Sequence, residues 1–138
     1  MPTLTSGLTE VVVDDEDLAR LLASSSLFNS VMVKPAAFMP NPKDGETSVF
    51  RHGSEPRDSL WQLARDHAIG ERTLHGAAII TTRRVREVDP LDVVASEPPP
   101  RHANIRGWAW SADDPDMGKA ERKEQAARIA QHAEFVRA

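Results

Sequence analysis

The chain has 138 residues, of which 40% are hydrophobic and 28% charged, and its formal net charge is −4. This length fits a single domain with an ordinary hydrophobic core. The absence of cysteine excludes disulfides, thiolate zinc sites and cysteine nucleophiles, and it is typical of the reducing cytoplasm.

The sequence predicts a cytoplasmic protein with no membrane partner. Its first ten residues, MPTLTSGLTE, have neither a basic nor an apolar region of the kind found in secretory signals. No apolar run approaches the ~20 residues of a membrane span. The net acidity, concentrated in residues 1–50, disfavours a general nucleic-acid binder.

In chain order, residues 1–14 are expected to form a flexible or strand-like N-terminal segment. The stretch DDEDLARLLASS that follows has acidic residues where the first turn of a helix favours them. Leu18, Leu21 and Leu22 share one face of that helix. We therefore predict a helix from residue 14 to residue 25.

Residues 47–53, TSVFRHG, predict a short strand with Val49 on one face and Ser48 and Phe50 on the other. Residues 54–70 predict a helix, because Pro56 suits a first turn and Gly70 suits the position after the end.

The second half of the chain contains two expected extended segments, at residues 77–80 and 91–95. The stretch TTRRVREV between them fits a strand or a short helix equally well. Residues 118–138 have high helix propensity throughout and predict a C-terminal helix. Its thin apolar stripe contains Ala126, Ile129, Ala133 and Val136.

Short strands mixed with about three helices predict a small single-domain α+β fold with mostly antiparallel strands. The expected organisation is an N-terminal segment at residues 1–14, an α+β core at residues 15–117 and a C-terminal helix at residues 118–138.

The segment PPPRHANIRGWAW, residues 98–110, is the first candidate site. Three prolines favour an extended, polyproline-like backbone that would hold the following residues in place. Arg101 carries a fixed cation, His102 can exchange a proton near neutrality, and Asn104 offers both a donor and an acceptor. We interpret the segment as a stiffened arm that presents Arg101 and His102. The alternative is that these groups only bond main chain.

A second Arg-His pair, Arg51 and His52, precedes the expected helix at residues 54–70. A helix N-terminus attracts anions. If the two pairs met across one cleft, His52 and His102 would supply the acid and the base for phosphodiester cleavage, with Asn104 orienting. The alternative is two unrelated surface pairs.

Arg83, Arg84 and Arg86 form a basic cluster that fits either phosphate contacts or a solvated face. The histidines and carboxylates lack the spacings of metal ligands, and no glycine-rich phosphate loop occurs. We therefore expect neither a metal nor a cofactor.

Four apolar residues are candidates for contact with a partner protein or a second copy of this chain. Phe38 and Met39 lie between prolines and fit an exposed docking strip or a core plug. Trp108 and Trp110 are candidates for the same surface, and their alternative is the core.

Three segments, VKPAAFMP, SVFRHG and RHANIRGW, resemble signatures of a group of small, uncharacterised bacterial proteins. The resemblance implies that these segments matter most, and it assigns no role to any residue.

The favoured hypothesis is a small cytoplasmic accessory module that binds a protein in a bacterial multi-protein system. The second is a metal-independent phosphodiester-cleaving enzyme or anion-binding domain that uses Arg51, His52, Arg101 and His102. The third is a nucleic-acid-binding domain.

Overall fold

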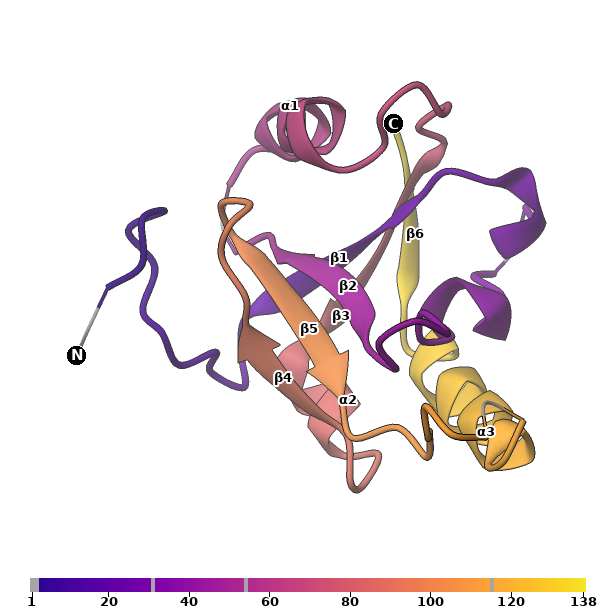
Figure 1. Ribbon diagram of the computed structural model, residues 1–138. Helices are drawn as coiled ribbons and strands as arrows, with labels where there is room; N and C mark the ends of the chain where they lie inside the picture. The colour runs from indigo at the N-terminus through magenta and orange to yellow at the C-terminus, as the bar shows by residue number, and fades with distance from the viewer. Residues whose placement is uncertain (1–2, 31, 54, 115) are drawn as a thin grey trace.

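The computed structural model describes residues 3–30, 32–53, 55–114 and 116–138. Within these residues, six strands form one antiparallel sheet in the order β4-β5-β2-β1-β3-β6 (Figure 1). The strands are β1 (Asp17–Leu22), β2 (Thr47–Arg51), β3 (Gly76–Thr81), β4 (Asp92–Ala95), β5 (His102–Arg106) and β6 (Glu134–Arg137).

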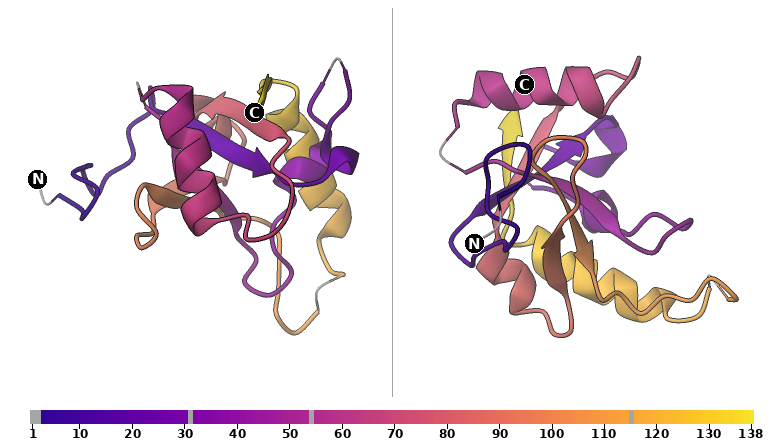
Figure 2. Two further views of the ribbon diagram at one scale, coloured as in Figure 1. Left: turned by 90° about the horizontal axis from the view of Figure 1, so that it is seen from above. Right: turned by 60° about the vertical axis from the view of Figure 1, so that its left-hand side comes forward.

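Helices lie on both sides of this sheet. Figure 2 shows α1 (Arg57–His67) on one side and α2 (Thr82–Arg86) with α3 (Lys119–Ala130) on the other. Two 3-10 turns, η1 (Ser25–Leu27) and η2 (Pro35–Phe38), complete the regular structure of the described residues. The predicted α+β fold with mostly antiparallel strands is therefore confirmed.

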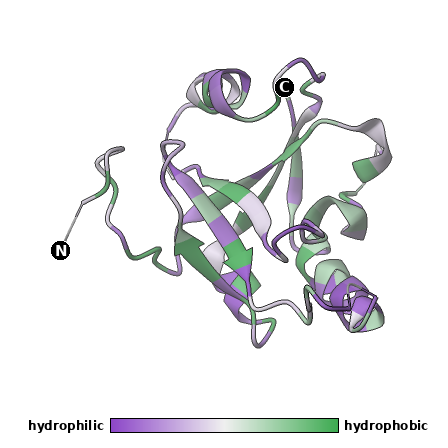
Figure 3. Ribbon diagram, in the orientation of Figure 1, coloured by the Kyte–Doolittle hydropathy of each residue, from purple (hydrophilic) through white to green (hydrophobic). Residues whose placement is uncertain are grey.

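The strands divide the apolar side chains between two cores, because successive residues of a strand point to opposite faces. Val49 and Leu18 belong to the larger core, together with Ile129 of α3. Phe50 belongs to the smaller core, which Leu60 and Trp61 of α1 cover. Figure 3 shows this alternation along β5, where hydrophilic and hydrophobic residues succeed each other. The expected opposite facing of Val49 and Phe50 is confirmed.

The helix predicted for residues 14–25 is wrong, because β1 occupies Asp17–Leu22. The spacing of Leu18 and Leu22 is four residues, which places them on one face of a strand as well as of a helix. Both lie in the larger core, whereas Leu21 packs against the smaller one. Pairing with β3 along the whole of β1 outweighs the local helix propensity.

The C-terminal helix is shorter than predicted. It ends at Ala130, and Glu134–Arg137 form strand β6, which pairs with β3. Val136 therefore packs in the smaller core, while Ala126 and Ile129 of the helix pack in the larger one. The edge of β3 supplies main-chain hydrogen-bond partners to β6. The local sequence pattern of residues 118–138 does not predict this pairing.

Other elements agree with the sequence in type and are shorter than predicted. The strand predicted at 47–53 forms as Thr47–Arg51 and the helix predicted at 54–70 forms as Arg57–His67. The stretch TTRRVREV takes the short-helix alternative as α2. The segment 98–110 differs from the expected arm, because His102–Arg106 form β5, which lies between β2 and β4.

A buried arginine attaches the N-terminal segment to the sheet. Arg51 is 1% exposed, and its guanidinium donates to the carbonyls of Thr9 at 2.6 Å and Val11 at 3.4 Å. It also forms an ion pair with Glu16 at 2.6 Å. A buried cation is tolerated only when it is paired and hydrogen-bonded in this way. Residues 9–16 are therefore held by the end of β2.

Replacing Arg51 with alanine is expected to destabilise the protein by about 3–5 kcal/mol, because Glu16 and two carbonyls would lose a buried partner. Urea unfolding measures this change, and Arg84→Ala is the matched control because that side chain is half exposed. Hydrogen exchange should accelerate in residues 9–16. A cost equal to that of Arg84→Ala would contradict the attachment.

Candidate functional site

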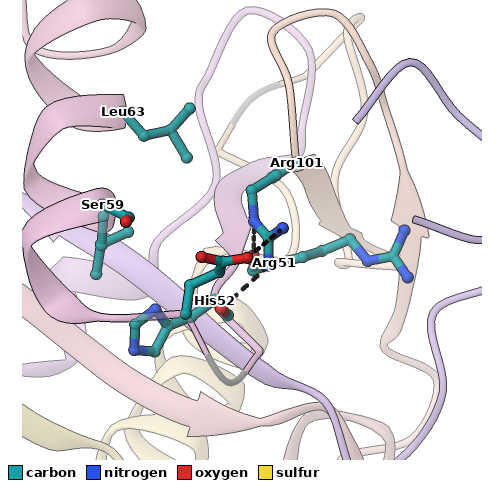
Figure 4. Close-up of a pocket in the computed structure, with 7 residues that line it drawn as sticks. Arg51, His52, Ser59, Leu63 and Arg101 are labelled. Atoms are coloured by element: carbon teal, nitrogen blue, oxygen red, sulfur yellow. Dashed lines mark hydrogen bonds and ion pairs between the residues drawn. The ribbon is translucent and has the colours of Figure 1, made fainter. Parts of the chain in front are cut away.

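Three of the four residues of the two Arg-His pairs line one pocket. Arg51, His52 and Arg101 border a cavity of about 210 Å³ together with Glu55, Ser59, Leu60 and Leu63. Figure 4 shows the Arg51 side chain turned away from His52 and Ser59. Its guanidinium is already occupied by the N-terminal segment. Arg51 therefore forms part of the wall and does not offer its charge to a ligand.

Arg101 is turned back onto β2. Its backbone has φ +66, and its guanidinium donates to the carbonyl of Arg51 at 2.7 Å and to that of His52 at 3.1 Å. A Glu55 carboxylate oxygen lies 3.7 Å from its Nη1. The proposed arm is thus tied to the sheet through its own arginine.

His52 is the histidine of this pocket. Its Nδ1 atom is buried and has no hydrogen-bond partner among the described residues. Burial lowers the pKa of His52, and the charges of Arg101 and Arg57 act in the same direction, against Asp17 and Glu55. The neutral ring is therefore favoured in the folded protein.

The lowered pKa of His52 predicts a pH dependence of stability. The unfolded chain binds a proton near its ordinary value of ~6.5, whereas the folded protein binds it only at lower pH. This contribution is present above ~6.5 and is lost as the pH falls through the folded pKa. Wild type should therefore lose more unfolding free energy on acidification than His52→Gln does in parallel urea titrations. Equal losses would show that His52 titrates normally.

His102 lies in a different place. Its Nδ1 is 2.8 Å from the carbonyl of Ser96, and its Nε2 is 2.6 Å from Ser48 Oγ. Because a carbonyl only accepts, Nδ1 carries the proton in the neutral ring, and Nε2 accepts from the Ser48 hydroxyl. Phe50 meets the ring edge-on at 5.4 Å between centroids. His52 and His102 therefore do not line a common pocket.

Ser48, Ser96, His102 and Asn104 line a second, larger pocket of about 650 Å³. Met39 and Pro40 form another part of its wall. The segments VKPAAFMP, SVFRHG and RHANIRGW thus all contribute to this pocket. Asn104 lies opposite Ser48 in the β2–β5 register, so the two side chains share the sheet face of His102.

A further part of the wall is the turn at residues 41–46, which Trp110 supports. Gly45 has φ +70, and a Cβ at this position would collide with the Trp110 ring. Glycine is thus required by both the backbone and the contact. Asp44 and Glu46, on either side of it, line the pocket.

Arg20 enters the same pocket from β1. The β1–β2 ladder has two register pairs, Leu18↔Arg51 and Ala19↔Phe50. Beyond them the guanidinium of Arg20 bridges the strands and donates to the carbonyls of Ser48 at 2.9 Å and Ala37 at 2.7 Å. Arg20 therefore replaces main-chain pairing where β1 and β2 separate.

Arg20 also lines a third pocket, of about 390 Å³, with Arg72 and Ser48. The ion pairs of the described residues include neither arginine, and no acidic residue lines this pocket. Burial, and secondly the charge of Arg72, lower the pKa of Arg20. The guanidinium of Arg72 donates to the carbonyls of Ala68 at 3.0 Å and Ile69 at 3.1 Å. Two cations therefore face one cavity with main-chain carbonyls as partners and no carboxylate in its wall.

The residues expected to dock a partner are mostly interior. Phe38 is 0% and Trp108 7% exposed, and both lie in the larger core. Met39 and Trp110 are partly buried against that core. The core-plug alternative thus describes Phe38, and the exposed docking strip does not form.

Two of the three arginines of the basic cluster on α2 have acidic partners. Arg86 forms ion pairs at 2.7 Å with Asp14 and Asp92, and Arg84 lies 3.5 Å from Glu87. Arg83, the third arginine of the cluster, is exposed and forms none of the ion pairs of the described residues. One arginine out of three therefore keeps its charge free for phosphates. The solvated-face interpretation of this cluster fits the geometry better.

Comparison with known proteins finds no matching family model, no matching curated protein and no matching solved structure. Among the described helices, none is long and apolar enough to cross a membrane. Function therefore has to be inferred from the geometry of the pockets.

Sequence reasoning missed Arg20, Arg72 and Ser48. Arg20 lies in the stretch whose pattern wrongly predicts a helix, and the pattern around Ser48 indicates only a strand. Ser48 and His102 are 54 positions apart in the sequence and meet only because β2 pairs with β5. No local sequence pattern predicts such a contact. The one available signal was that Ser48 and His102 belong to two of the three singled-out segments.

Proposed function

We propose that this protein binds a small organic anion in the cavity between β1, β2 and the segment that follows α1. The supporting observation is that Arg20 and Arg72 line this cavity and neither has a carboxylate partner among the described residues. A guanidinium presents a planar fork of donors that suits carboxylates and phosphates.

The wall of the cavity supports a ligand with an apolar part. Leu21, Leu27 and Phe50 lie beside the two arginines, and Ser24 and Ser48 add hydroxyl groups. Apolar walls with a few polar groups are typical of small-molecule sites. The ligand class is therefore a carboxylate or phosphate attached to a small apolar body.

This proposal takes up the anion-binding alternative and moves it from Arg51 and Arg101 to Arg20 and Arg72. The protein-binding hypothesis has weaker support, because Phe38 and Trp108 are buried. The exposed large apolar residues of the described chain lie in three segments: Val11 and Val13 in the first, Met32 in the second and Met117 in the third. Scattered exposed hydrophobic residues are ordinary on protein surfaces.

The test is an NMR titration of the full chain with inorganic phosphate and with succinate at constant ionic strength. We expect saturable shifts of the amides of residues 20–24 and 68–72. Arg72→Gln should weaken binding about tenfold or more, since a hydrogen bond to a charged group contributes roughly 1.5–3 kcal/mol.

Arg65→Gln is the matched control, because Arg65 is exposed on α1 and does not line the cavity. Arg20→Gln is the second variant, and its fold is checked by circular dichroism because Arg20 also joins β1 to β2. Equal affinity in Arg72→Gln and Arg65→Gln, or shifts spread over the whole surface, would refute the anion site.

A further inference from the structure

Ser48 and His102 have the geometry of a nucleophile and its base. A nucleophilic serine needs a base within hydrogen-bond reach and a third group that orients that base. Ser48 Oγ lies 2.6 Å from Nε2 of His102, and the Ser96 carbonyl holds Nδ1 at 2.8 Å. The carbonyl fixes the tautomer in which Nε2 is free to accept the serine proton.

The surrounding fold holds this pair in place. Ser48 and His102 lie on adjacent paired strands, β2 and β5, where Phe50 and His102 are register partners. The edge-on contact with Phe50 restricts the imidazole ring. Groups positioned by paired strands are more precisely placed than groups on loops.

The pair faces an open cavity. Both side chains are partly exposed, and both line the pocket of about 650 Å³ that also contains Asn104 and Arg20. A serine–histidine bond that served only packing would not need to border a cavity of this size. Asn104 lies opposite Ser48 and can supply an amide donor to a developing oxyanion.

We propose that Ser48 is the nucleophile of an acyl-transfer reaction and that His102 is its general base. The substrate class is an ester or thioester of a small organic acid that carries an anionic group. This choice of substrate rests on the proposed anion site, because Ser48 lines the cavity of Arg20 and Arg72 as well.

In the first half of the reaction, Ser48 Oγ forms a bond to the acyl carbon and its proton passes to His102 Nε2. The bond to the leaving oxygen or sulfur then breaks, and that atom takes the proton from His102. In the second half, water attacks the acyl-serine ester and gives a proton to His102. The released Ser48 oxygen recovers that proton as the carboxylic acid leaves.

The first experiment incubates the full chain with a fluorophosphonate and locates the adduct by peptide mass spectrometry. We expect a single adduct at Ser48. It should be absent from Ser48→Ala and unchanged in Ser30→Ala, whose serine is exposed and lines none of the three pockets. His102→Gln should slow labelling about 100-fold or more. No adduct at Ser48 in the folded protein, or equal rates in His102→Gln, would overturn the proposal.

A second variant keeps the test independent of the folding of His102→Gln. The chain contains no cysteine, so Ser48→Cys carries one unique thiol beside an intact His102. At neutral pH it should react with iodoacetamide at least tenfold faster than the thiol of Ser30→Cys, although position 30 is more exposed. A slower or equal rate would count against His102 as a base.

The anion site and the serine nucleophile can be refuted independently of each other. A small neutral fluorophosphonate does not need the arginines, so Arg72→Gln should still be labelled at Ser48. Labelling without phosphate or succinate binding would retain the nucleophile and remove the anion site. Anion binding without labelling would retain the site and remove the nucleophile.

Discussion

The alternation of side chains along β2 is the constraint on which the other features depend. Val49 and Arg51 point to the larger core and the N-terminal segment, whereas Ser48 and Phe50 point to the opposite face. A slip of one residue would exchange the two sets. It would move a buried cation into the space of Phe50 and remove the hydroxyl from His102. Core, N-terminal attachment and candidate site are thus specified by the same pairing.

Arg51 and Arg20, on the neighbouring strands β2 and β1, have different partners for their buried guanidinium groups. Arg51 is compensated within the fold by Glu16 and by main-chain carbonyls. Arg20 has the carbonyls of Ser48 and Ala37 but no carboxylate among the described residues. A cation paired in the fold has a structural role, because its charge is already neutralised. A cation beside a second cation, Arg72, keeps a net attraction for an anion from solution.

Local patterns predicted those elements whose signals had one interpretation. The strand at 47–51 contains Val49 and Phe50, which favour extended structure. The helix at 57–67 is preceded by Pro56 and followed, three residues after its end, by Gly70. The helix prediction for residues 17–22 was wrong because a spacing of four between leucines fits both the helical period of 3.6 and the strand period of 2. The predicted end of the C-terminal helix was wrong for a related reason. Residues 134–137 form a strand because the edge of β3 is available for pairing. In both cases the deciding partner is distant in sequence.

The candidate site shows the same division between local chemistry and distant pairing. The side chains of His102 and Asn104 can exchange a proton or form hydrogen bonds, which makes them candidates from the sequence, and both border the large pocket. The sequence leaves open whether His52 meets His102 across one cleft or the two Arg-His pairs are unrelated. The register instead pairs His102 with Phe50 and brings Ser48 to its Nε2. Because alternate residues of a strand share one face, Ser48, two positions before Phe50, reaches the imidazole of His102. His52 lies beyond the end of β2 and lines the pocket next to α1 instead. With Ser48 instead of His52 as the partner of His102, the expected chemistry changes. Two histidines would act on a phosphodiester, whereas a hydroxyl beside an imidazole suits an acyl group.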